Sequence, residues 1–230
     1  MRALTAEITV IIPTLNAEGS LPQCLGALME GLPAGLIREV IITDGGSDDA
    51  TCRIAEAAGA ELIKGAASRG GQLRRAGDAA RGRWLMVLHA DTVLDPGWAQ
   101  VVLDHIHSRD AGTAYFQLAF RATGIMPALV AGWANLRAGL FGLPYGDQGL
   151  LVRTADYRRA GGYPDQPLME DVALARALKK PLTALPVRAV TSPERYRQSG
   201  WLRRGARNLW TLLRYYAGAD PERLAQAYRR

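Results

Sequence analysis

Short apolar runs alternate with amphipathic segments along the first half of the chain. The runs at 8–12, 39–43, 61–64 and 84–88 have the length and composition of buried strands. Between and after them, apolar residues recur at helical spacing, as Leu21, Leu25 and Leu28 do, which predicts helices over 20–31, 49–58, 68–81 and 96–108. Strands that alternate with helices are typical of a parallel sheet covered by helices. The pattern therefore predicts an α/β fold.

The second half of the chain is less regular. Residues 113–120 alternate like an edge or antiparallel strand, 146–153 resemble another strand, and helices are expected over 155–160 and 172–179. The apolar stretch 125–143 contains Pro127, Arg137 and three glycines, so it is a poor spanning helix and is expected to pack on the domain or at an interface. We expect a Rossmann-like, mostly parallel central sheet flanked by helices, with a small antiparallel part.

Polar clusters follow three of the predicted strands. Thr14 and Asn16 follow the first strand, Asp44-Gly45-Gly46 the second, and His89-Ala90-Asp91 the run 84–88. Ligands of open α/β sheets bind at this edge, and adjacent glycines let backbone approach a phosphate closely. The fingerprint GxGxxG is absent after the first strand, which argues against a Rossmann dehydrogenase.

For Asp91, and for three charged residues elsewhere in the chain, two interpretations stay open at this point. Asp91 is either a turn residue or a ligand of a divalent cation that also holds substrate phosphates. Arg69 lies either on a solvated basic face or against a base or phosphate. Glu170 and Asp171 either complement a helix dipole or include a carboxylate that accepts a proton from an attacking hydroxyl. Asp95-Pro96 is expected to begin the helix 96–108.

Composition and cysteine content narrow the class of protein. A chain of 230 residues with 48% hydrophobic residues is long enough for one large domain and too apolar to be disordered. Cys24 and Cys52 suggest neither a disulfide framework nor a metal cluster, which indicates a reducing compartment. The amino terminus lacks the long apolar region of a secretory leader. We expect a cytoplasmic protein.

The positive charge is concentrated near the carboxyl terminus. The net charge is +6, but residues 195–230 hold nine arginines against Asp220 and Glu222, which leaves the rest at −1. This distribution argues against a nucleic-acid partner for the domain and indicates an anionic partner for the tail. On a helical wheel the tail has an apolar side and a basic side. The apolar side consists of Leu202, Ala206, Leu209, Leu213 and Tyr216, and the basic side consists of Arg203, Arg207 and Arg214. The tail either rests on anionic lipid, peripherally at the inner face of the membrane, or packs on the domain with its arginines in water.

Four segments together resemble a known family. They are VIIPTLNAE (10–18), TDGGSDDAT (43–51), ARGRWLMVLHADT (80–92) and GLLVRTADYRRAGGYPDQPLMEDVALARAL (149–178). Their order is similar to that of the family 2 glycosyltransferases, which have a GT-A fold, and the similarity runs from about residue 8 to 193. The subgroup with His-Ala-Asp in place of Asp-X-Asp is the most similar. We therefore expect a GT-A domain over 1–193 and a basic helical extension over 194–230.

The resemblance implies a function and a set of site residues. It implies an inverting, metal-dependent transfer of a sugar from a nucleoside-diphosphate sugar, a UDP-sugar, to a hydroxyl acceptor that the sequence does not identify. Asp91 would coordinate Mg²⁺ or Mn²⁺, and Asp171 of the Glu170-Asp171 pair would be the general base. The residues expected to bind the nucleotide are Pro13, Thr14, Asn16, Glu18, Asp44, Gly45, Arg69, His89, Ala90 and Asp91.

The chain departs from the family pattern at two places. His89 replaces the first Asp of Asp-X-Asp, and a hard cation prefers oxygen to imidazole, so His89 could contact either ribose or the metal. The Gln-X-X-Arg-Trp segment of polymerising synthases is not reproduced, which argues against a processive polymerase. Two alternatives remain: a non-catalytic module that binds nucleotide sugar or a membrane surface, and a nucleotidyltransferase. The segment 13–20, PTLNAEGS, lacks the Gly-rich loop with a basic residue that nucleotidyltransferases have after the first strand, which argues against the second alternative. The sugar, the acceptor and the oligomeric state stay open.

Overall fold

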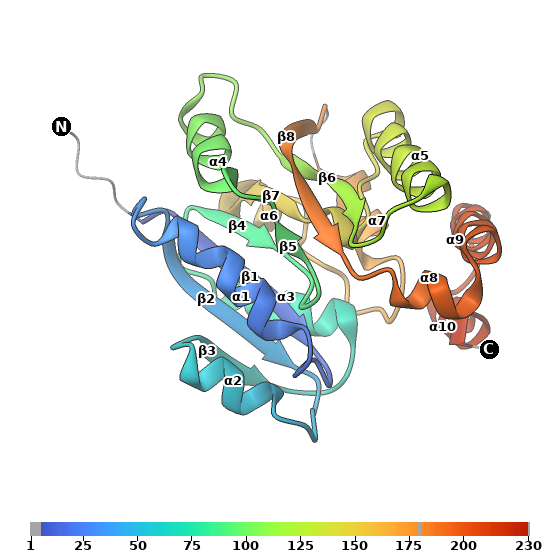
Figure 1. Cartoon of the computed structure of the whole chain (residues 1–230), viewed down its shortest axis with the longest axis horizontal. Coiled ribbons are helices and arrows are strands. Elements are labelled where there is room, and N and C mark those ends of the chain that lie inside the picture. Colours follow the sequence, from blue (N-terminus) through green and yellow to red (C-terminus); the bar gives the residue numbers. More distant parts are fainter. Residues whose placement is uncertain (1–5, 179–180, 230) are drawn as a thin grey trace.

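The computed structural model describes residues 6–178 and 181–229, and its centre is one mixed sheet (Figure 1). The strand order in the described chain is β3-β2-β1-β4-β7-β6-β8-β5. The strands are β1 (Ile8–Thr14), β2 (Ile37–Asp44), β3 (Glu61–Lys64), β4 (Trp84–Val87), β5 (Val93–Leu94), β6 (Ala114–Phe120), β7 (Leu150–Arg153) and β8 (Thr183–Thr191). The predicted α/β class is confirmed.

Helices connect and cover the strands. The helices of the first half are α1 (Leu21–Leu28), the 3-10 turn η1 (Met29–Gly31), α2 (Thr51–Ala57), α3 (Arg69–Ala79) and α4 (Trp98–His107). Those of the second half are α5 (Ile125–Phe141), the 3-10 turn η2 (Gly146–Gln148), α6 (Thr154–Arg159), α7 (Glu170–Ala177), α8 (Glu194–Ser199), α9 (Trp201–Tyr216) and α10 (Pro221–Arg229). The predicted end of the helix 172–179 at Lys179 lies outside the described residues.

The sheet has a parallel half and a mixed half that meet between β4 and β7. Strands β3, β2, β1 and β4 are parallel neighbours, whereas β7 is antiparallel to both β4 and β6. Strand β8 then pairs in parallel with β6 and antiparallel with β5. The small antiparallel part expected from the sequence is therefore present: β7 lies between the two parallel groups, and β5 lies at the edge of the sheet.

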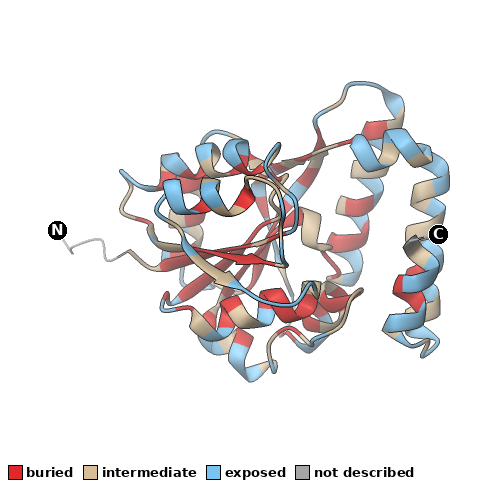
Figure 2. Ribbon diagram, turned by 90° about the horizontal axis from the view of Figure 1, so that it is seen from below, coloured by how far each residue is buried: buried red, intermediate tan, exposed pale blue. Residues whose placement is uncertain are grey.

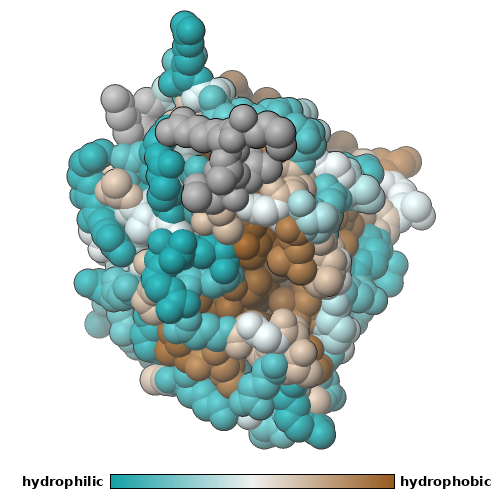
Figure 3. Space-filling model, turned by 90° about the vertical axis from the view of Figure 1, so that its left-hand side faces the viewer, coloured by the Kyte–Doolittle hydropathy of each residue, from teal (hydrophilic) through white to brown (hydrophobic). Residues whose placement is uncertain are grey.

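Both faces of the sheet are buried, which explains why β1 is almost continuously apolar. Ile8, Val10 and Ile12 face a core formed with α1 and α4, whereas Ile11 faces a second core formed with α3, α6 and α7. Buried residues accordingly concentrate in the strands, while the helices near the carboxyl terminus are largely intermediate or exposed (Figure 2). The end at which β1 and β4 begin has apolar residues gathered in a recess with a hydrophilic rim (Figure 3).

Two local expectations are wrong, and one strand was not expected. Asp95-Pro96 does not begin a helix: α4 starts at Trp98 after Gly97, whose φ of 89° is left-handed, and Asp95 pairs instead with Arg188. Residues 146–153 are not one strand, because η2 precedes β7. Strand β8 was not predicted at all; its Pro186 is a residue that disfavours strands.

The tail does not pack on the domain in the way that the second interpretation expected. The expected apolar side of α9 does not pack on the domain: Leu202, Leu213 and Tyr216 are 76%, 53% and 46% exposed. The inward side is formed instead by Thr211 and Leu212, which are buried. The stretch 125–143 does pack on the domain as α5, and none of the described helices combines the length and apolar character needed to cross a membrane.

Candidate functional site

The polar ends of β1, β2 and β4 lie at one edge of the sheet. Thr14 is the register partner of Asp44, and the Leu88 amide that precedes His89 donates to the carbonyl of Ile11. Because the three strands are parallel neighbours, their carboxyl ends necessarily meet. The predicted convergence of Thr14, Asp44 and the His-Ala-Asp segment on one rim is therefore seen.

Asp44 holds the loop between β2 and α2. One carboxylate oxygen accepts from Thr14 Oγ1 at 3.0 Å and Ser47 Oγ at 2.5 Å, and the other accepts from the amides of Gly46 and Ser47 at 2.9 and 2.8 Å. Burial acts to raise the pKa of Asp44, but these hydrogen bonds outweigh it and lower the pKa below its usual value. The carboxylate is thus ionised and already satisfied within the loop.

The β1–α1 loop is fastened to that same loop by side chains expected to bind nucleotide. The Asn16 amide donates to Ser47 Oγ at 2.8 Å, while Asn16 Oδ1 accepts from the amide of Asp48 at 3.0 Å. Glu18 Oε2 accepts from the amide of Ala50 at 2.9 Å. These contacts fix the two loops together, so the shape of the rim depends on Asn16 and Glu18, and Pro13 enters it as the register partner of Thr43.

Gly45 is packed against Gln72 of helix α3, which supports the rim. A Cβ at Gly45 would lie 3.1 Å from Oε1 of Gln72. Gln72 itself is buried in α3, and its amide donates to the carbonyls of Thr14 and Thr43 at 2.8 and 2.7 Å. The close contact explains the small residue at position 45, and Gln72 is a supporting residue that the sequence did not reveal.

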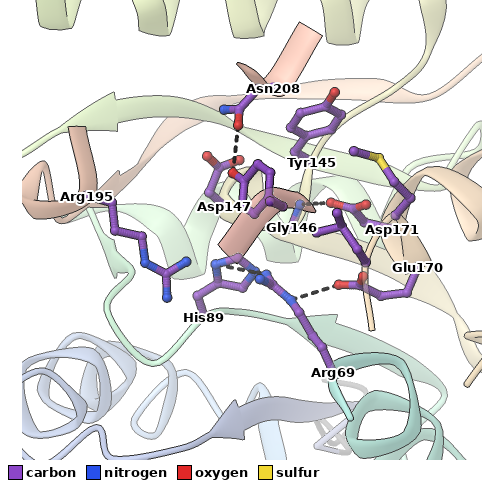
Figure 4. Close-up of a pocket in the computed structure, with 12 residues that line it drawn as sticks. Arg69, His89, Tyr145, Gly146, Asp147, Glu170, Asp171, Arg195 and Asn208 are labelled. Atoms are coloured by element: carbon purple, nitrogen blue, oxygen red, sulfur yellow. Dashed lines mark hydrogen bonds and ion pairs between the residues drawn. The ribbon is translucent and has the colours of Figure 1, made fainter. Parts of the chain in front are cut away.

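Arg69 connects this rim with the second half of the chain. It lies in the first turn of α3; its Nε is 2.8 Å from Glu170 Oε1, and its Nη2 is 3.2 Å from His89 Nδ1 (Figure 4). Burial acts to lower the pKa of Arg69, but Glu170 and three nearby aspartates (Asp171, Asp147 and Asp91) outweigh it and raise the pKa. Arg69 therefore lines the candidate cavity and pairs with Glu170, rather than lying on a solvated basic face.

His89 is held as a neutral imidazole. Burial, followed by the positive charges of Arg69 and Arg195, keeps the pKa of His89 well below its usual value. A Cβ at Gly146 would lie 2.5 Å from His89 Nε2 and 2.9 Å from Arg69 Nη2, so a larger residue there would displace these side chains. The imidazole can accept or donate a hydrogen bond near neutral pH but brings no charge to the rim.

The start of α7 orients Asp171 and buries Glu170. Met169, just before the helix, has a φ of 64°, one of two non-glycine residues with positive φ in the described chain. Asp171 Oδ2 accepts from the amide of Gly146 at 2.8 Å, and Oδ1 accepts from the amide of Val172 at 2.7 Å. Glu170 is 2% exposed and pairs with Arg69; burial raises its pKa and the guanidinium opposes the rise. Of the two acids, Asp171 is free of an ion pair in the described chain.

Arg69, His89, Glu170 and Asp171 line one cavity of about 120 Å³, which is room for part of a ligand rather than a whole sugar nucleotide. The rim residues Thr14, Asn16, Glu18, Asp44 and Asp91 are not among its lining residues. Its walls come from α3, the loop after β4, η2, α7 and the last three helices. The lining residues that the sequence analysis did not select are Tyr145, Asp147, Leu168, Met169, Arg195, Asn208 and Tyr228, with Gly146. Asn208 and Tyr228 lie in the tail, so the predicted extension contributes to the cavity.

Asp147 adds an unpaired carboxylate to this cavity. Its Oδ1 is buried without a hydrogen-bond partner. Burial raises the pKa of Asp147 to about 6, while the Arg137 guanidinium opposes the rise. It escaped selection because 146–153 was interpreted as a strand, although the segment GDQG has the composition of a turn.

The protein side chains at the site suit a divalent cation only if substrate oxygens complete its coordination. In the described part of the chain, no group of three or more His, Cys, Asp or Glu side chains could hold a metal ion. Asp91 is half-buried, and its charge acts on Arg69 and Cys24. Mg²⁺ and Mn²⁺ sites of the type with one or two carboxylates and substrate phosphate oxygens fit this arrangement.

Comparisons with known proteins agree with the fold. The model of the family described as "Glycosyl transferase family 2" matches residues 9–125, just over half of the chain. No curated protein sequence gives a match.

Solved structures match over most of the chain at low identity. TarS 1-349 of S. aureus is 15% identical with a TM-score of 0.59, covering 84% of this chain and 62% of that one. Mannosyltransferase PcManGT of Pyrobaculum calidifontis, in complex with GDP-Man and Mn²⁺, is 18% identical with a TM-score of 0.60, covering 86% and 62%. Glucosyl-3-phosphoglycerate synthase of Mycobacterium tuberculosis, with Mg²⁺ and UDP, is 18% identical with a TM-score of 0.54, covering 81% and 70%. The chain thus spans less than two thirds of the first two proteins.

Proposed function

The chain belongs to glycosyl transferase family 2, and we propose that it is an inverting, metal-dependent glycosyltransferase. The donor would be a nucleoside-diphosphate sugar and the acceptor a hydroxyl group. Within the family, the chain would fall in the subgroup with His-Ala-Asp, residues 89–91, in place of Asp-X-Asp. Relatives of the same fold have been solved with UDP, UDP-GlcNAc and GDP-Man, and we favour a UDP-sugar for this chain.

The observation that carries this proposal is the placement of Asp171. The amide of Gly146 fixes one oxygen of the carboxylate, and Arg69 ties the start of α7 to the loop after β4. A base on one side of the cavity and a phosphate-binding rim on the other is the arrangement that a single displacement needs. The acceptor oxygen would form the new bond to the anomeric carbon as the bond to the diphosphate oxygen breaks. Asp171 would take the hydroxyl proton.

The residues of the rim have separate tasks in this scheme. The loops fixed by Asp44, Asn16 and Glu18 would hold the nucleoside, and neutral His89 would hydrogen-bond the ribose or a phosphate oxygen. Asp91 would hold Mg²⁺ or Mn²⁺, which when bound supplies Lewis-acid stabilisation of the departing diphosphate. Glu170 would act through Arg69 as a positioning residue, because it is buried in that ion pair.

The proposed location follows from the charge of the tail. Nine arginines against two acidic residues in 195–230 favour an anionic partner, and we place the protein peripherally at the cytoplasmic face of a membrane.

Turnover by Asp171→Asn tests the assignment of the base. We expect release of UDP from UDP-sugars with Mn²⁺ and an acceptor mixture, and a loss of about 10²- to 10⁴-fold in kcat for Asp171→Asn, because the variant cannot accept the proton. Affinity for UDP, measured by calorimetry, should be unchanged. Asp104→Asn on the outer side of α4 is the matched control and should keep full activity.

Two results would contradict the proposal. Full turnover by Asp171→Asn would remove Asp171 from the chemistry. Binding of sugar nucleotides without transfer or hydrolysis, across donors and acceptors, would favour the non-catalytic module instead.

A further inference from the structure

Helix α5 presents a continuous apolar stripe to solvent. Five of its exposed large side chains recur every three or four residues, the spacing of one helix face, and Phe141 follows the last of them at the end of the helix. The exposed residues are Ile125 (78% exposed), Leu129 (60%), Trp133 (50%), Leu136 (52%), Leu140 (69%) and Phe141 (63%). The opposite side of the helix, including Ala134, Arg137 and Ala138, is buried against the domain, so the orientation of the stripe is fixed by packing.

Helix α9, which contacts α5, also exposes large apolar residues. Its exposed large apolar residues are Leu202 (76% exposed), Leu209 (42%), Trp210 (63%), Leu213 (53%) and Tyr216 (46%). The two helices are in contact and lie together at the right-hand side of Figure 1. Trp201 at the start of α9 packs with the α5 residues Val130, Ala131 and Ala134, and Leu212 packs on Met169 and Val172. We call the exposed apolar residues of both helices the α5–α9 surface.

A surface of this size needs a partner. Soluble monomers rarely expose contiguous apolar patches beyond a few hundred Å². Here eleven large apolar side chains on two neighbouring helices are 42% exposed or more. Scattered apolar residues elsewhere, such as Leu32 at 49%, are single and need no explanation.

The charge around the surface indicates the kind of partner. Neither α5 nor α9 contains an acidic residue, and α9 carries Arg203, Arg204, Arg207 and Arg214. Basic residues beside an apolar stripe that includes tryptophans are typical of helices that lie at the boundary between lipid headgroups and acyl chains.

We propose that the α5–α9 surface rests on a bilayer that contains anionic phospholipid, with its apolar side chains inserted and Arg203 and Arg214 against phosphates. Arg204 and Arg207 instead donate hydrogen bonds to Tyr228 of α10. This proposal specifies the proposed peripheral location and does not depend on the transfer reaction. A second copy of the chain is the other apolar partner to consider. A two-fold dimer through this surface would bring the α9 arginines of both copies together without any acid from either helix, whereas anionic lipid neutralises them.

Binding of the α5–α9 surface to a bilayer would also set the position of the candidate site relative to the membrane. Asn208 lies on α9 and Tyr228 on α10, and both line the cavity that contains Asp171. A membrane under α9 would therefore lie beside the wall of the cavity that the tail provides.

Flotation of the full chain with vesicles tests the proposal. We expect binding to vesicles of phosphatidylcholine mixed with phosphatidylglycerol, weak binding to phosphatidylcholine alone, and release by salt. The double variant Leu129→Gln/Leu140→Gln should lower the partition coefficient by about tenfold or more, because it removes two inserted side chains. Leu32→Gln, an exposed apolar residue away from the surface, is the matched control.

A charge variant tests the arginines separately. Arg203→Glu should weaken binding to the anionic vesicles, while Arg109→Glu, exposed beyond α4, should not. Asp171→Asn should bind vesicles as the unchanged chain does, which separates a failure of this inference from a failure of the proposed reaction.

Three outcomes would overturn the inference. The first is no binding to the anionic vesicles. The second is equal binding to neutral and anionic vesicles, which would remove the role of the arginines. The third is a stable dimer by light scattering that Leu129→Gln/Leu140→Gln dissociates, without vesicle binding, which would assign the surface to a second copy.

Discussion

Asp147 is the carboxylate whose environment is least favourable for its charge. Its Oδ1 has no hydrogen-bond partner, and burial raises the pKa to about 6. A carboxyl group with a folded-state pKa above its unfolded value of 3.8 binds its proton more tightly in the folded state. Its contribution to stability is therefore greatest at low pH and is lost as the pH rises through about 6.

Asp147→Asn should therefore stabilise the protein in a pH-dependent way. The amide cannot ionise, so its advantage in free energy of unfolding over the unchanged chain should grow by on the order of 1 kcal/mol between pH about 5 and about 8. Urea denaturation at the two pH values measures it. A difference that is the same at both would show that burial of the charge is not the cause, and Asp104→Asn should show no such trend.

At the scale of single residues, the sequence identified the groups at the ends of strands and missed those in turns. His89 and Asp91 follow a recognisable strand and Arg69 begins a recognisable helix, and the structure brings Arg69 close to both. Asp147 was missed because the segment was assigned to a strand, although GDQG itself was a usable signal. Asn208 and Tyr228 carry no local signal, since only the folding back of the tail brings them to the cavity.

At the scale of elements, α4 is capped from a distant segment. The Glu30 carboxylate of η1 accepts from the amides of Gly97 and Ala99 at 3.0 to 3.1 Å. The helix therefore needs no capping side chain of its own, and Asp95 is left to pair with Arg188. A local capping rule could not find this, because the acceptor lies 67 residues before Gly97.

Glu30→Ala should destabilise the fold through α4. It removes the acceptor of two amides and a negative charge at a helix amino terminus, which together cost about 1 kcal/mol. The free energy of unfolding in urea measures the loss. Glu56→Ala on α2, an exposed glutamate, is the control and should change stability little; equal losses for both would refute the cap.

Element recognition succeeded where burial on both faces made the pattern strong. The parallel strands β1, β2 and β4 were found because their residues are apolar on both sides. In strand β8 the buried residues Leu185, Val187 and Ala189 alternate with exposed ones, as in a half-buried strand. The alternation was not interpreted as a strand because one of the exposed residues is Pro186, and proline disfavours strands. Strand β5 has two residues, too few for any periodic pattern.

At the scale of the whole molecule, the cavity is assembled from residues far apart in the chain. The rim belongs to the parallel half of the sheet, whereas Asp171 lies in the chain between β7 and β8 of the mixed half. The helical wheel of the tail grouped the correct residues but could not say which side faces the domain. That side is determined by the contact of Leu212 with Met169 and Val172.

Binding of UDP should stabilise the whole fold, because both loops of the rim and the loop after β4 must be in place. UDP with Mn²⁺ at a hundred times its Kd should add about 2.7 kcal/mol to the free energy of unfolding. Asp91→Asn should remove the part that depends on Mn²⁺, and the unfolding midpoint with and without Mn²⁺ measures it. An unchanged effect of Mn²⁺ in the variant would exclude Asp91 as its ligand, and Asp104→Asn should behave as the unchanged chain does.

The meeting of β4 and β7 has a consequence for protein engineering. Every other strand pairing of the described sheet joins strands from the same side of position 92: β1 to β4 before it and β5 to β8 after it. A hybrid protein that took residues up to 92 from one parent and the remainder from another would have to match one strand ladder of four residue pairs, Trp84–Val87 against Leu150–Arg153. It would also have to keep the side-chain contacts that cross position 92, such as those of Glu30 with Gly97 and of Arg69 with Glu170.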